Sequence, residues 1–238
     1  MSLRNNGKQK EGITIETKRL NGNCAEDIVI AAELLKNGGL VAIPTETVYG
    51  LAADATNGAA VERIFKAKGR PQDNPLIVHI SSYEQLERLV SHIPEHAKRL
   101  METFWPGPLT VILPKSNLIP DQVSAGLPTV AVRLPSHPVA RAVIQEAGVP
   151  LAAPSANVSG SPSPTAAAHV LHDLDGKIDA VIDGGPCTIG LESTVITLAE
   201  ETPVLLRPGA VTLEQLQQVL GTVKMADAVL HQLKQGSV

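Results

Sequence analysis

Polar residues that could carry chemistry follow directly after an apolar segment in the first quarter of the chain. The run PTETVYG comes after residues 40–43, which read as a short buried strand, and a polar loop at a strand end is a common place for a binding site. Thr45 and Thr47 could orient a small polar ligand, and Glu46 could accept a proton or assist a cation. The same three residues could equally cap the next turn. The run marks a candidate site but leaves its chemistry open.

Positively charged residues gather at the end of a predicted helix over residues 58–68. Lys66 suits this position, because the helix dipole stabilises cations at a helix C-terminus. Lys68 and Arg70 are two residues apart, and in an extended chain such positions face the same side. They could converge on phosphate oxygens, Lys as a point charge and Arg as a bidentate donor. A solvated charged surface is the alternative explanation.

A second polar loop, PSANVSG, follows a predicted strand over residues 149–153. Ser155 and Asn157 have short side chains and allow a close approach of the backbone, as a phosphate or ribose site requires. Ser163 and Thr165 then open a predicted helix, whose free N–H groups could face an anion. Ordinary N-capping by either residue is the alternative.

Two ionisable residues lie at the ends of other predicted strands. His79 closes the apolar run PLIVH, where it could be a half-buried structural histidine or a ligand contact, and nothing local decides between the two. Arg133 ends the run TVAV, and a buried arginine needs an anion or a carboxylate as its partner. A substrate carboxylate is a good candidate for that partner.

Composition limits the class of function. The net charge is −4, so any nucleic-acid footprint must be local, and aromatic residues form only 2% of the chain, too few for an extended stacking surface. The two cysteines, Cys24 and Cys187, form no CxxC pair, which argues against a disulfide framework and fits a reducing cytoplasm. No apolar run reaches the length of a membrane-spanning helix. We therefore expect a cytoplasmic protein.

Several motifs with a known mechanical role do not occur. The sequence has no GxxxxGK[ST] loop, GxGxxG fingerprint, HExxH pair or GxSxG elbow. P-loop hydrolysis, Rossmann binding, zinc proteolysis and serine-esterase chemistry therefore lack their parts. A nucleotide would need a different cradle.

Helical and strand-like patterns alternate along the chain. Helices are predicted over residues 25–37, 58–68, 83–90, 94–104, 137–147, 166–174 and 213–220. Strands are predicted over residues 40–43, 75–80, 109–113, 129–134, 149–153, 180–182, 193–198 and 204–206. Several strands are joined by turns too short for a crossover helix, which indicates a single α/β (α+β) domain with a twisted mixed sheet. We expect residues 1–20 to be a disordered lead-in, 21–220 the catalytic domain and 221–238 a tail or a truncated linker.

Seven segments stand out in order along the chain: PTETVYGLA, KAKGRPQDNPLIVHI, FWPGPLTVIL, TVAVRLP, APSANVSGSPSPT, GLESTVI and LLRPG. Together they resemble the YrdC-type threonylcarbamoyl-adenylate synthase family. The resemblance implies a twisted, largely closed sheet around a deep, positively charged cleft. It also implies a nucleotidyltransferase reaction in which L-threonine, bicarbonate and ATP give threonylcarbamoyl-AMP and pyrophosphate. The threonylcarbamoyl group is then destined for adenosine 37 of certain tRNAs.

The resemblance also implies roles for individual residues. The K-x-R and S-x-N motifs of the family fall on Lys68, Arg70, Ser155 and Asn157, and the first two are the implied catalytic pair. The other implied ATP contacts are Asn74, Thr129, Ser163 and Arg207. The implied L-threonine contacts are Thr47, His79, Arg133 toward the carboxylate, Ser193 and the backbone near Ala153. No protein side chain is implied as a metal ligand, and magnesium is expected on the ATP.

One departure from the family concerns the C-terminal region. Longer members continue through a linker resembling SPGMKYRHYAP into a second domain, and this sequence contains neither, so we expect a natural short form or a truncated piece. The expected partners are the tRNA threonylcarbamoyl transferase machinery downstream and RNA in contact with the cleft. Two other classes stay open, namely a double-stranded RNA or tRNA-binding module and a carbamoyl-transfer domain of the hydrogenase-maturation type.

Overall fold

The computed structural model describes residues 16–234, which form eleven strands and nine helices. The strands are β1 (Lys18–Asn21), β2 (Val41–Ile43), β3 (Gly50–Asp54), β4 (Ile77–His79), β5 (Leu109–Pro114), β6 (Thr129–Arg133), β7 (Leu151–Ala152), β8 (Ala180–Asp183), β9 (Thr194–Thr197), β10 (Val204–Arg207) and β11 (Lys224–Met225). The helices are α1 (Ala25–Lys36), α2 (Gly58–Lys68), α3 (Tyr83–Leu89), α4 (Glu95–Phe104), α5 (Asp121–Ser124), α6 (Pro138–Ala147), α7 (Ala167–Leu174), α8 (Leu213–Leu220) and α9 (Asp227–Lys234).

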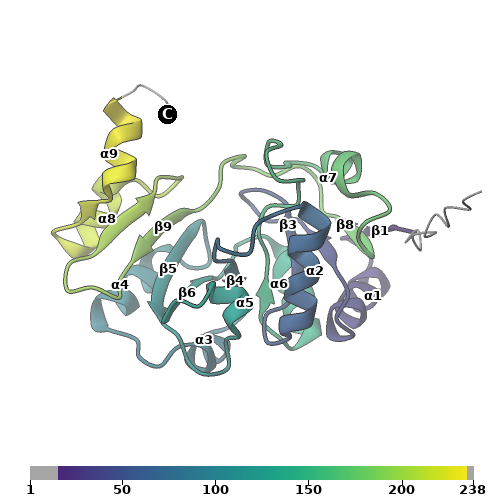
Figure 1. Ribbon diagram of the computed structural model, residues 1–238, viewed down its shortest axis with the longest axis horizontal. Coiled ribbons are helices and arrows are strands. Elements are labelled where there is room, and N and C mark those ends of the chain that lie inside the picture. Colours follow the sequence, from purple (N-terminus) through teal and green to yellow (C-terminus); the bar gives the residue numbers. More distant parts are fainter. Residues whose placement is uncertain (1–15, 235–238) are drawn as a thin grey trace, which may run out of the picture.

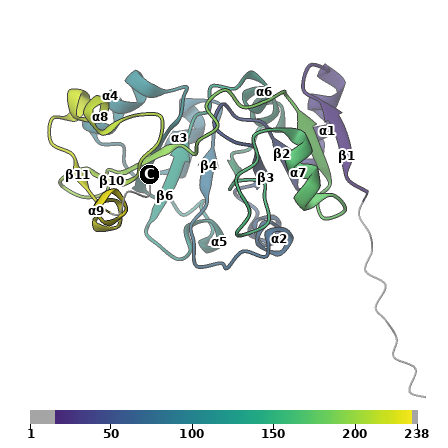
Figure 2. The same ribbon diagram turned by 90° about the horizontal axis from the view of Figure 1, so that it is seen from above.

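All eleven strands belong to one mixed sheet, in the order β1-β8-β2-β3-β7-β4-β6-β5-β9-β10-β11. The sheet contains both parallel pairs, such as β4 with β6, and antiparallel pairs, such as β5 with β6. Figure 2 shows β11 and β1 at opposite sides of the molecule, with β6 and β4 between them. The predicted α/β fold with a twisted mixed sheet is confirmed.

The part of the sheet formed by β8, β2, β3 and β7 is covered on both faces. Side chains of β2 alternate between two cores, because successive residues of a strand point to opposite faces. Val41 and Ile43 pack in the core that includes α1 and α6, and Ala42 packs in the core that includes α2 and α7. The nearly continuous apolar composition of β2, β3 and β8 follows from this burial on both sides.

Helix ends follow recognisable local signals. The Asn57 side chain accepts a hydrogen bond from the Ala60 amide and caps the start of α2, and Gly69, with φ of 61°, ends the same helix in the left-handed conformation. Thr212 and Gln215 form a capping box at the start of α8. These caps explain why both helices occupy the ranges predicted from the sequence.

Two boundary expectations need correction. The lead-in was expected to be disordered to residue 20, but Lys18–Asn21 forms β1, which pairs in parallel with β8, and the buried Thr17 hydroxyl donates to the Ile178 carbonyl. Residues 1–15 lie outside the described part of the chain. The expected tail also folds, because β11 pairs with β10 and α9 follows it as far as Lys234. Short edge elements of this kind carry little periodicity of their own.

Replacement of Leu35 in α1 should destabilise the fold, because its side chain is fully buried between α1 and the sheet. Leu35→Ala should lower the free energy of unfolding by about 2–5 kcal/mol, through lost burial and the cavity left behind. Ile30→Ala on the exposed side of the same helix, where 38% of the residue is accessible, should cost much less. Urea denaturation of both variants measures the difference, and equal losses would contradict this packing.

Candidate active site

A cavity of about 440 Å³ opens over β4, β6 and the loops beside them, a size typical of small-molecule sites. Its walls come from the β2–β3 loop, the segment before β4, the loop after β7 and the segments flanking β9 and β10. Nine of the predicted site residues line it: Thr47, Arg70, Asn74, His79, Arg133, Ala153, Ser155, Ser193 and Arg207. The fold therefore brings together residues that are far apart in the sequence.

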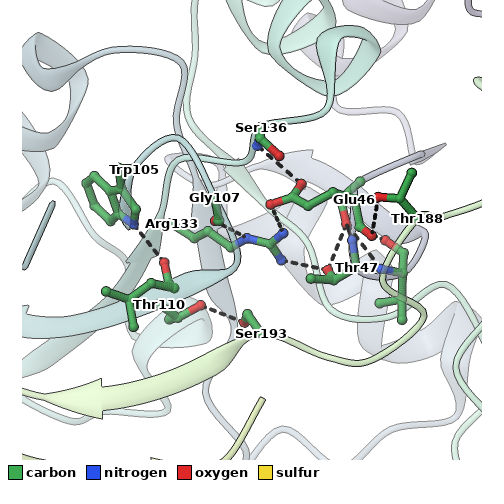
Figure 3. Close-up of polar contacts among 12 residues, drawn as sticks. Glu46, Thr47, Trp105, Gly107, Thr110, Arg133, Ser136, Thr188 and Ser193 are labelled. Atoms are coloured by element: carbon green, nitrogen blue, oxygen red, sulfur yellow. Dashed lines mark hydrogen bonds and ion pairs between the residues drawn. The ribbon is translucent and has the colours of Figure 1, made fainter. Parts of the chain in front are cut away.

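Arg133, at the end of β6, lies at the centre of a buried polar cluster (Figure 3). Its Nη2 lies 2.6 Å from Glu46 Oε1, and its Nη1 donates to the Thr47 hydroxyl at 2.8 Å. Its Nε donates to the Gly107 carbonyl at 3.2 Å. Only 3% of the Arg133 side chain and 8% of the Glu46 side chain are exposed. The charge of Arg133 is therefore held almost entirely by protein groups.

Glu46 is the anionic partner that the buried Arg133 was predicted to need. Within residues 16–234, Glu46 Oε1 and Arg133 Nη2 have no polar partner except each other, and Glu46 Oε2 accepts from the Ser136 amide at 3.2 Å. The buried Arg133 does have a carboxylate partner, and the protein itself supplies that carboxylate. Burial raises the pKa of Glu46, and the charge and hydrogen bond of Arg133, with the amide of Ser136, outweigh it, so the pKa lies below its ordinary value.

The two threonines beside Glu46 have different roles, one in capping the turn and one in the polar cluster around Arg133. The Thr45 hydroxyl donates to the Val48 carbonyl at 2.6 Å and accepts from the Thr47 and Val48 amides, so it caps the turn. The Thr47 hydroxyl accepts from Arg133 and lies 2.9 Å from the Thr45 hydroxyl. Thr47 thus joins the turn to Arg133 on the wall of the cavity.

His79 is buried on the cavity wall at the end of β4, in register with Arg133 of the neighbouring strand. Burial, with a further contribution from the charge of Arg133, lowers the pKa of His79 to about 3. Its Nδ1 has no hydrogen-bond partner among residues 16–234. A neutral imidazole in this position can accept or donate one hydrogen bond without adding charge.

Lys68 does not take the position that its spacing from Arg70 suggested. The extended-chain argument is wrong here, because Lys68 is the last residue of α2 and Gly69 turns the chain before Arg70. The buried Lys68 ammonium donates to the carbonyls of Ser155 and Asn157, the latter at 2.5 Å, and it does not line the cavity. Burial, with the charge of Arg70, lowers its pKa to about 8. Lys68 therefore supports the loop that presents Ser155.

Three other predicted ATP contacts lie outside the cavity wall. Asn157 donates to the Ser161 carbonyl at 2.7 Å and shapes the same loop, and its buried Oδ1 has no partner within the described chain. Thr129 begins β6 opposite Pro114, two residues before the wall residue Ala131. Ser163 donates to Glu192 Oε1 at 3.0 Å. The extended-strand and polar-loop patterns could not distinguish wall residues from those that support them.

A second polar cluster lies around Arg207, at the end of β10. Arg207 donates from Nε to the Ser193 carbonyl at 2.9 Å and from Nη2 to the Ser193 hydroxyl at 3.0 Å, and its Nη1 forms an ion pair with Glu192. The Ser193 hydroxyl lies 2.8 Å from the buried Thr110 hydroxyl. Neither Glu192 nor Thr110 was predicted from the sequence as a site residue. Glu192 lies in the segment GLESTVI and Thr110 lies in the segment FWPGPLTVIL, and membership of these two segments was the available signal.

The charged groups on the cavity wall are three arginines, Arg70, Arg133 and Arg207, against one carboxylate, Glu192. Burial lowers the pKa of Arg70, and the carboxylates of Glu192 and Asp73 partly offset this shift. The Arg70 guanidinium makes no hydrogen bond or ion pair with residues 16–234, and its Nε is buried. The wall is thus suited to an anionic ligand, with Arg70 as an unused donor.

Neither a metal centre nor a membrane span was found in the part of the chain that the structure describes. No group of three or more His, Cys, Asp or Glu side chains there is placed to hold a metal ion. None of its helices has both the length and the apolar character needed to cross a membrane.

Fold and cavity together define an α/β protein with a cavity whose lining suits small anionic molecules. Residues 33–209 match the sequence profile of the Sua5/YciO/YrdC family, which carries the description "Telomere recombination". The chain belongs to the Sua5/YciO/YrdC family.

Relatives of known name cover most of this chain. The threonylcarbamoyl-AMP synthase of Bacillus subtilis is 55% identical over 91% of the chain and 62% of its own length. The solved structure of Pyrococcus abyssi Sua5 complexed with L-threonine has a TM-score of 0.86 and 54% identity, over 91% of this chain and 63% of its own. A putative threonylcarbamoyl-AMP synthase of Mycobacterium tuberculosis is 39% identical over 82% of this chain and 89% of its own length. The chain thus spans less than two thirds of the first two relatives.

Removal of the Glu46 carboxylate should strongly destabilise the protein. Glu46→Ala leaves the Arg133 charge buried without a counter-ion, and should lower the free energy of unfolding by about 3–5 kcal/mol. Glu33→Ala, which breaks the exposed pair with Lys36, should change it by less than about 1 kcal/mol. Chemical denaturation compares the two variants, and a small effect of Glu46→Ala would show that Arg133 finds compensation elsewhere.

His79 should make stability depend on pH. Its pKa is about 3 in the folded protein against 6.5 as the ordinary value, so the unfolded chain binds an extra proton between these limits. Its contribution to stability is therefore complete above pH 6.5 and is lost as the pH falls toward 3, by up to about 1.4 kcal/mol per unit. Stability of the parent and of His79→Gln, measured from pH 7 to pH 5, should fall more steeply for the parent. Parallel curves would contradict the low pKa.

Proposed function

We propose that this chain carries the active site of an L-threonylcarbamoyladenylate synthase, which converts L-threonine, bicarbonate and ATP into threonylcarbamoyl-AMP and pyrophosphate. The observation that carries the proposal is the cavity, where nine residues implied by the family resemblance meet on one wall. The L-threonine complex of the Pyrococcus abyssi relative, at 54% identity over 91% of this chain, supports it. The protein would act on small molecules, with tRNA modification as the later use of its product.

The polar groups of the cavity suggest two halves. The amino-acid half would consist of Thr47, His79, Arg133, Ala153 and Ser193. Arg133 is already paired with Glu46. A guanidinium has five N–H donors, however, and the three contacts of Arg133 to protein groups do not use all of them. Donors therefore remain for the carboxylate of an amino acid. The neutral His79 beside Arg133 would not repel the amino group of the substrate.

The nucleotide half would consist of Arg70, Asn74, Ser155 and Arg207 on the wall. The predicted ATP residues Lys68 and Asn157 would contribute by holding the loop that carries Ser155, since Lys68 donates to backbone carbonyls of that loop. Arginine suits phosphate oxygens because its planar donors bind them in pairs. We place Ser163 in this half because its hydroxyl contacts Glu192 on the cavity wall. Thr129 would lie outside the nucleotide half.

The proposed chemistry requires positioning and charge neutralisation more than acid–base groups. The threonine amino group adds to the carbon of carbon dioxide and loses a proton, or adds to the carbon of bicarbonate with loss of water, and either route gives a carbamate. A carbamate oxygen then forms a bond to the α-phosphorus of ATP while the bond to the pyrophosphate oxygen breaks. Arginines on both sides would hold the two anions together despite their repulsion, which lowers the barrier by proximity and electrostatics. No side chain is assigned as general base.

We propose that magnesium enters with ATP rather than on a dedicated protein site. Among residues 16–234, Glu192 is the only carboxylate on the cavity wall, whereas Mg²⁺ in nucleotide sites is held largely by phosphate oxygens and water. The ion would neutralise phosphate charge that the arginines leave uncovered. The product would pass to a tRNA threonylcarbamoyl transferase in the cytoplasm, and any contact of RNA with the cleft would have to use the arginines of the same wall.

The direct test is to incubate the protein with ATP, magnesium, bicarbonate and labelled L-threonine, and to measure pyrophosphate and the labelled adenylate. Both products should appear in equal amounts and only when threonine and bicarbonate are present. Pyrophosphate release that ignores threonine, or no product from a protein shown to be folded, would reject the proposed activity.

Arg70→Ala should weaken the use of ATP. A charge-assisted hydrogen bond to phosphate stabilises by about 1.5–3 kcal/mol, so the KM for ATP should rise by roughly 10- to 100-fold, with a smaller change for threonine. Arg141→Ala, at an exposed position of α6, is the matched control and should leave both constants unchanged. An unchanged KM for ATP in Arg70→Ala would remove Arg70 from the nucleotide half.

The role of Arg133 can be separated from its role in stability. The double variant Arg133→Met with Glu46→Gln removes both buried charges together, which avoids an uncompensated charge. It should fold and bind ATP, yet need about tenfold or more L-threonine for half-maximal rate, because the carboxylate loses its charged partner. Thermal unfolding and ATP binding serve as controls. A threonine requirement equal to that of the parent would show that Arg133 is structural only.

A further inference from the structure

The Glu192 carboxylate occupies the anion-binding groups of the nucleotide half. Glu192 Oε1 accepts from the Ser163 hydroxyl at 3.0 Å, and Oε2 forms the ion pair with Arg207 Nη1. Ser163 and Arg207 are both among the residues implied for ATP. The family resemblance does not assign a role to Glu192, although it lines the same cavity.

A carboxylate satisfies only part of this group of donors. Its two oxygens are used by Ser163 and Arg207, and no ion pair joins Glu192 to Arg70. The Arg70 guanidinium remains without a partner in residues 16–234, with its Nε buried. A phosphate group offers three oxygens and more negative charge, so it could serve all three donors at once. Glu192 therefore satisfies Ser163 and Arg207 but not Arg70, and a larger anion could satisfy all three.

The position of Glu192 in the chain allows its side chain to rotate away from Arg207 and Ser163 toward solvent. Glu192 lies near the end of the β8–β9 connection (residues 184–193), which crosses the molecule between its two sides in Figure 1. The backbone is held on either side of it, where the Gly190 amide donates to the Thr47 carbonyl and the Thr194 amide donates to the Pro108 carbonyl. The Glu192 side chain is 38% exposed. Rotation of this side chain toward solvent would free Nη1 of Arg207, while Ser193 still holds the rest of the guanidinium.

Electrostatics favour such an exchange over an empty pocket. Burial lowers the pKa of Arg207, and the charge and hydrogen bond of Glu192 oppose that shift. The same carboxylate acts on Arg70 and Lys68 in the same direction. Without an anion, the arginines of the wall would face each other across a half-buried space. Glu192 thus neutralises Arg207 and offsets part of the charge of Arg70, and it would repel a phosphate if it stayed in place.

We propose that Glu192 is an internal stand-in for phosphate, which holds Arg207 and Ser163 in the ligand-free protein and is displaced when a polyphosphate binds. This inference rests on the proposed function for the identity of the ligand as ATP, but not for the existence of the anion site. Glu192 thereby sets the affinity of the nucleotide half and selects for ligands with enough negative charge to displace it. A neutral or singly charged ligand would compete poorly.

The test removes the charge of Glu192 and keeps its shape. Binding of magnesium-ATP and, separately, of inorganic tripolyphosphate is measured by calorimetry for the parent, Glu192→Gln and the control Glu146→Gln, which removes an exposed carboxylate from α6. If Glu192 occupies the site in about nine molecules of ten, Glu192→Gln should bind both probes about tenfold more tightly. Glu146→Gln should bind as the parent does. Thermal unfolding checks that the variants are folded.

The two probes separate the failure of this inference from failure of the proposed function. Equal or weaker binding of tripolyphosphate by folded Glu192→Gln would overturn the inference, since Glu192 would then only position Arg207. If neither ATP nor tripolyphosphate bound to any of the folded variants, the inference would be overturned as well. Tighter tripolyphosphate binding without any ATP binding would uphold the role of Glu192 and reject the nucleotide. Should Glu192→Gln not fold, Glu192→Ser, which removes the charge and the reach, takes its place with the same expected direction.

Discussion

The buried ion pair between Glu46 and Arg133 is the interaction on which the site depends. It joins the β2–β3 loop to the end of β6, two parts of the sheet that are separated by β3, β7 and β4 in the strand order. Two charges so deeply buried are tolerated only because each atom that carries charge has a partner, from Glu46, Thr47, Gly107 and the Ser136 amide. The pair therefore constrains where the cavity walls can lie.

A similar logic governs the other end of the cavity. Lys68 is buried at the end of α2, and its ammonium donates to backbone carbonyls of the Ser155 loop. Arg207 contacts Glu192 and the carbonyl and hydroxyl oxygens of Ser193. Lys68, Arg133 and Arg207 thus all have partners within the protein. Arg70 differs, with no partner in the described chain, which makes it the natural first contact for an incoming anion.

Much of the local structure could be predicted from the sequence because its causes are local. The range of α2 follows from Asn57 and Gly69 at its ends, and the range of α8 follows from its capping box. Elements whose existence depends on a distant neighbour were missed, as with β1, which forms only by pairing with β8. The short strands β7 and β11 have two residues each, too few for a periodic pattern to define their limits.

The sequence by itself determined the α/β class, most helix and strand positions, and the list of residues that resembles the site of one family. Only the tertiary structure decided which of these residues share a wall and which support it. Residue spacing could not show that Gly69 redirects the chain between Lys68 and Arg70, or that Glu46 is the carboxylate that meets Arg133. Side-chain partners across a sheet depend on strand order and register, and these are set by long-range packing rather than by neighbours in the chain.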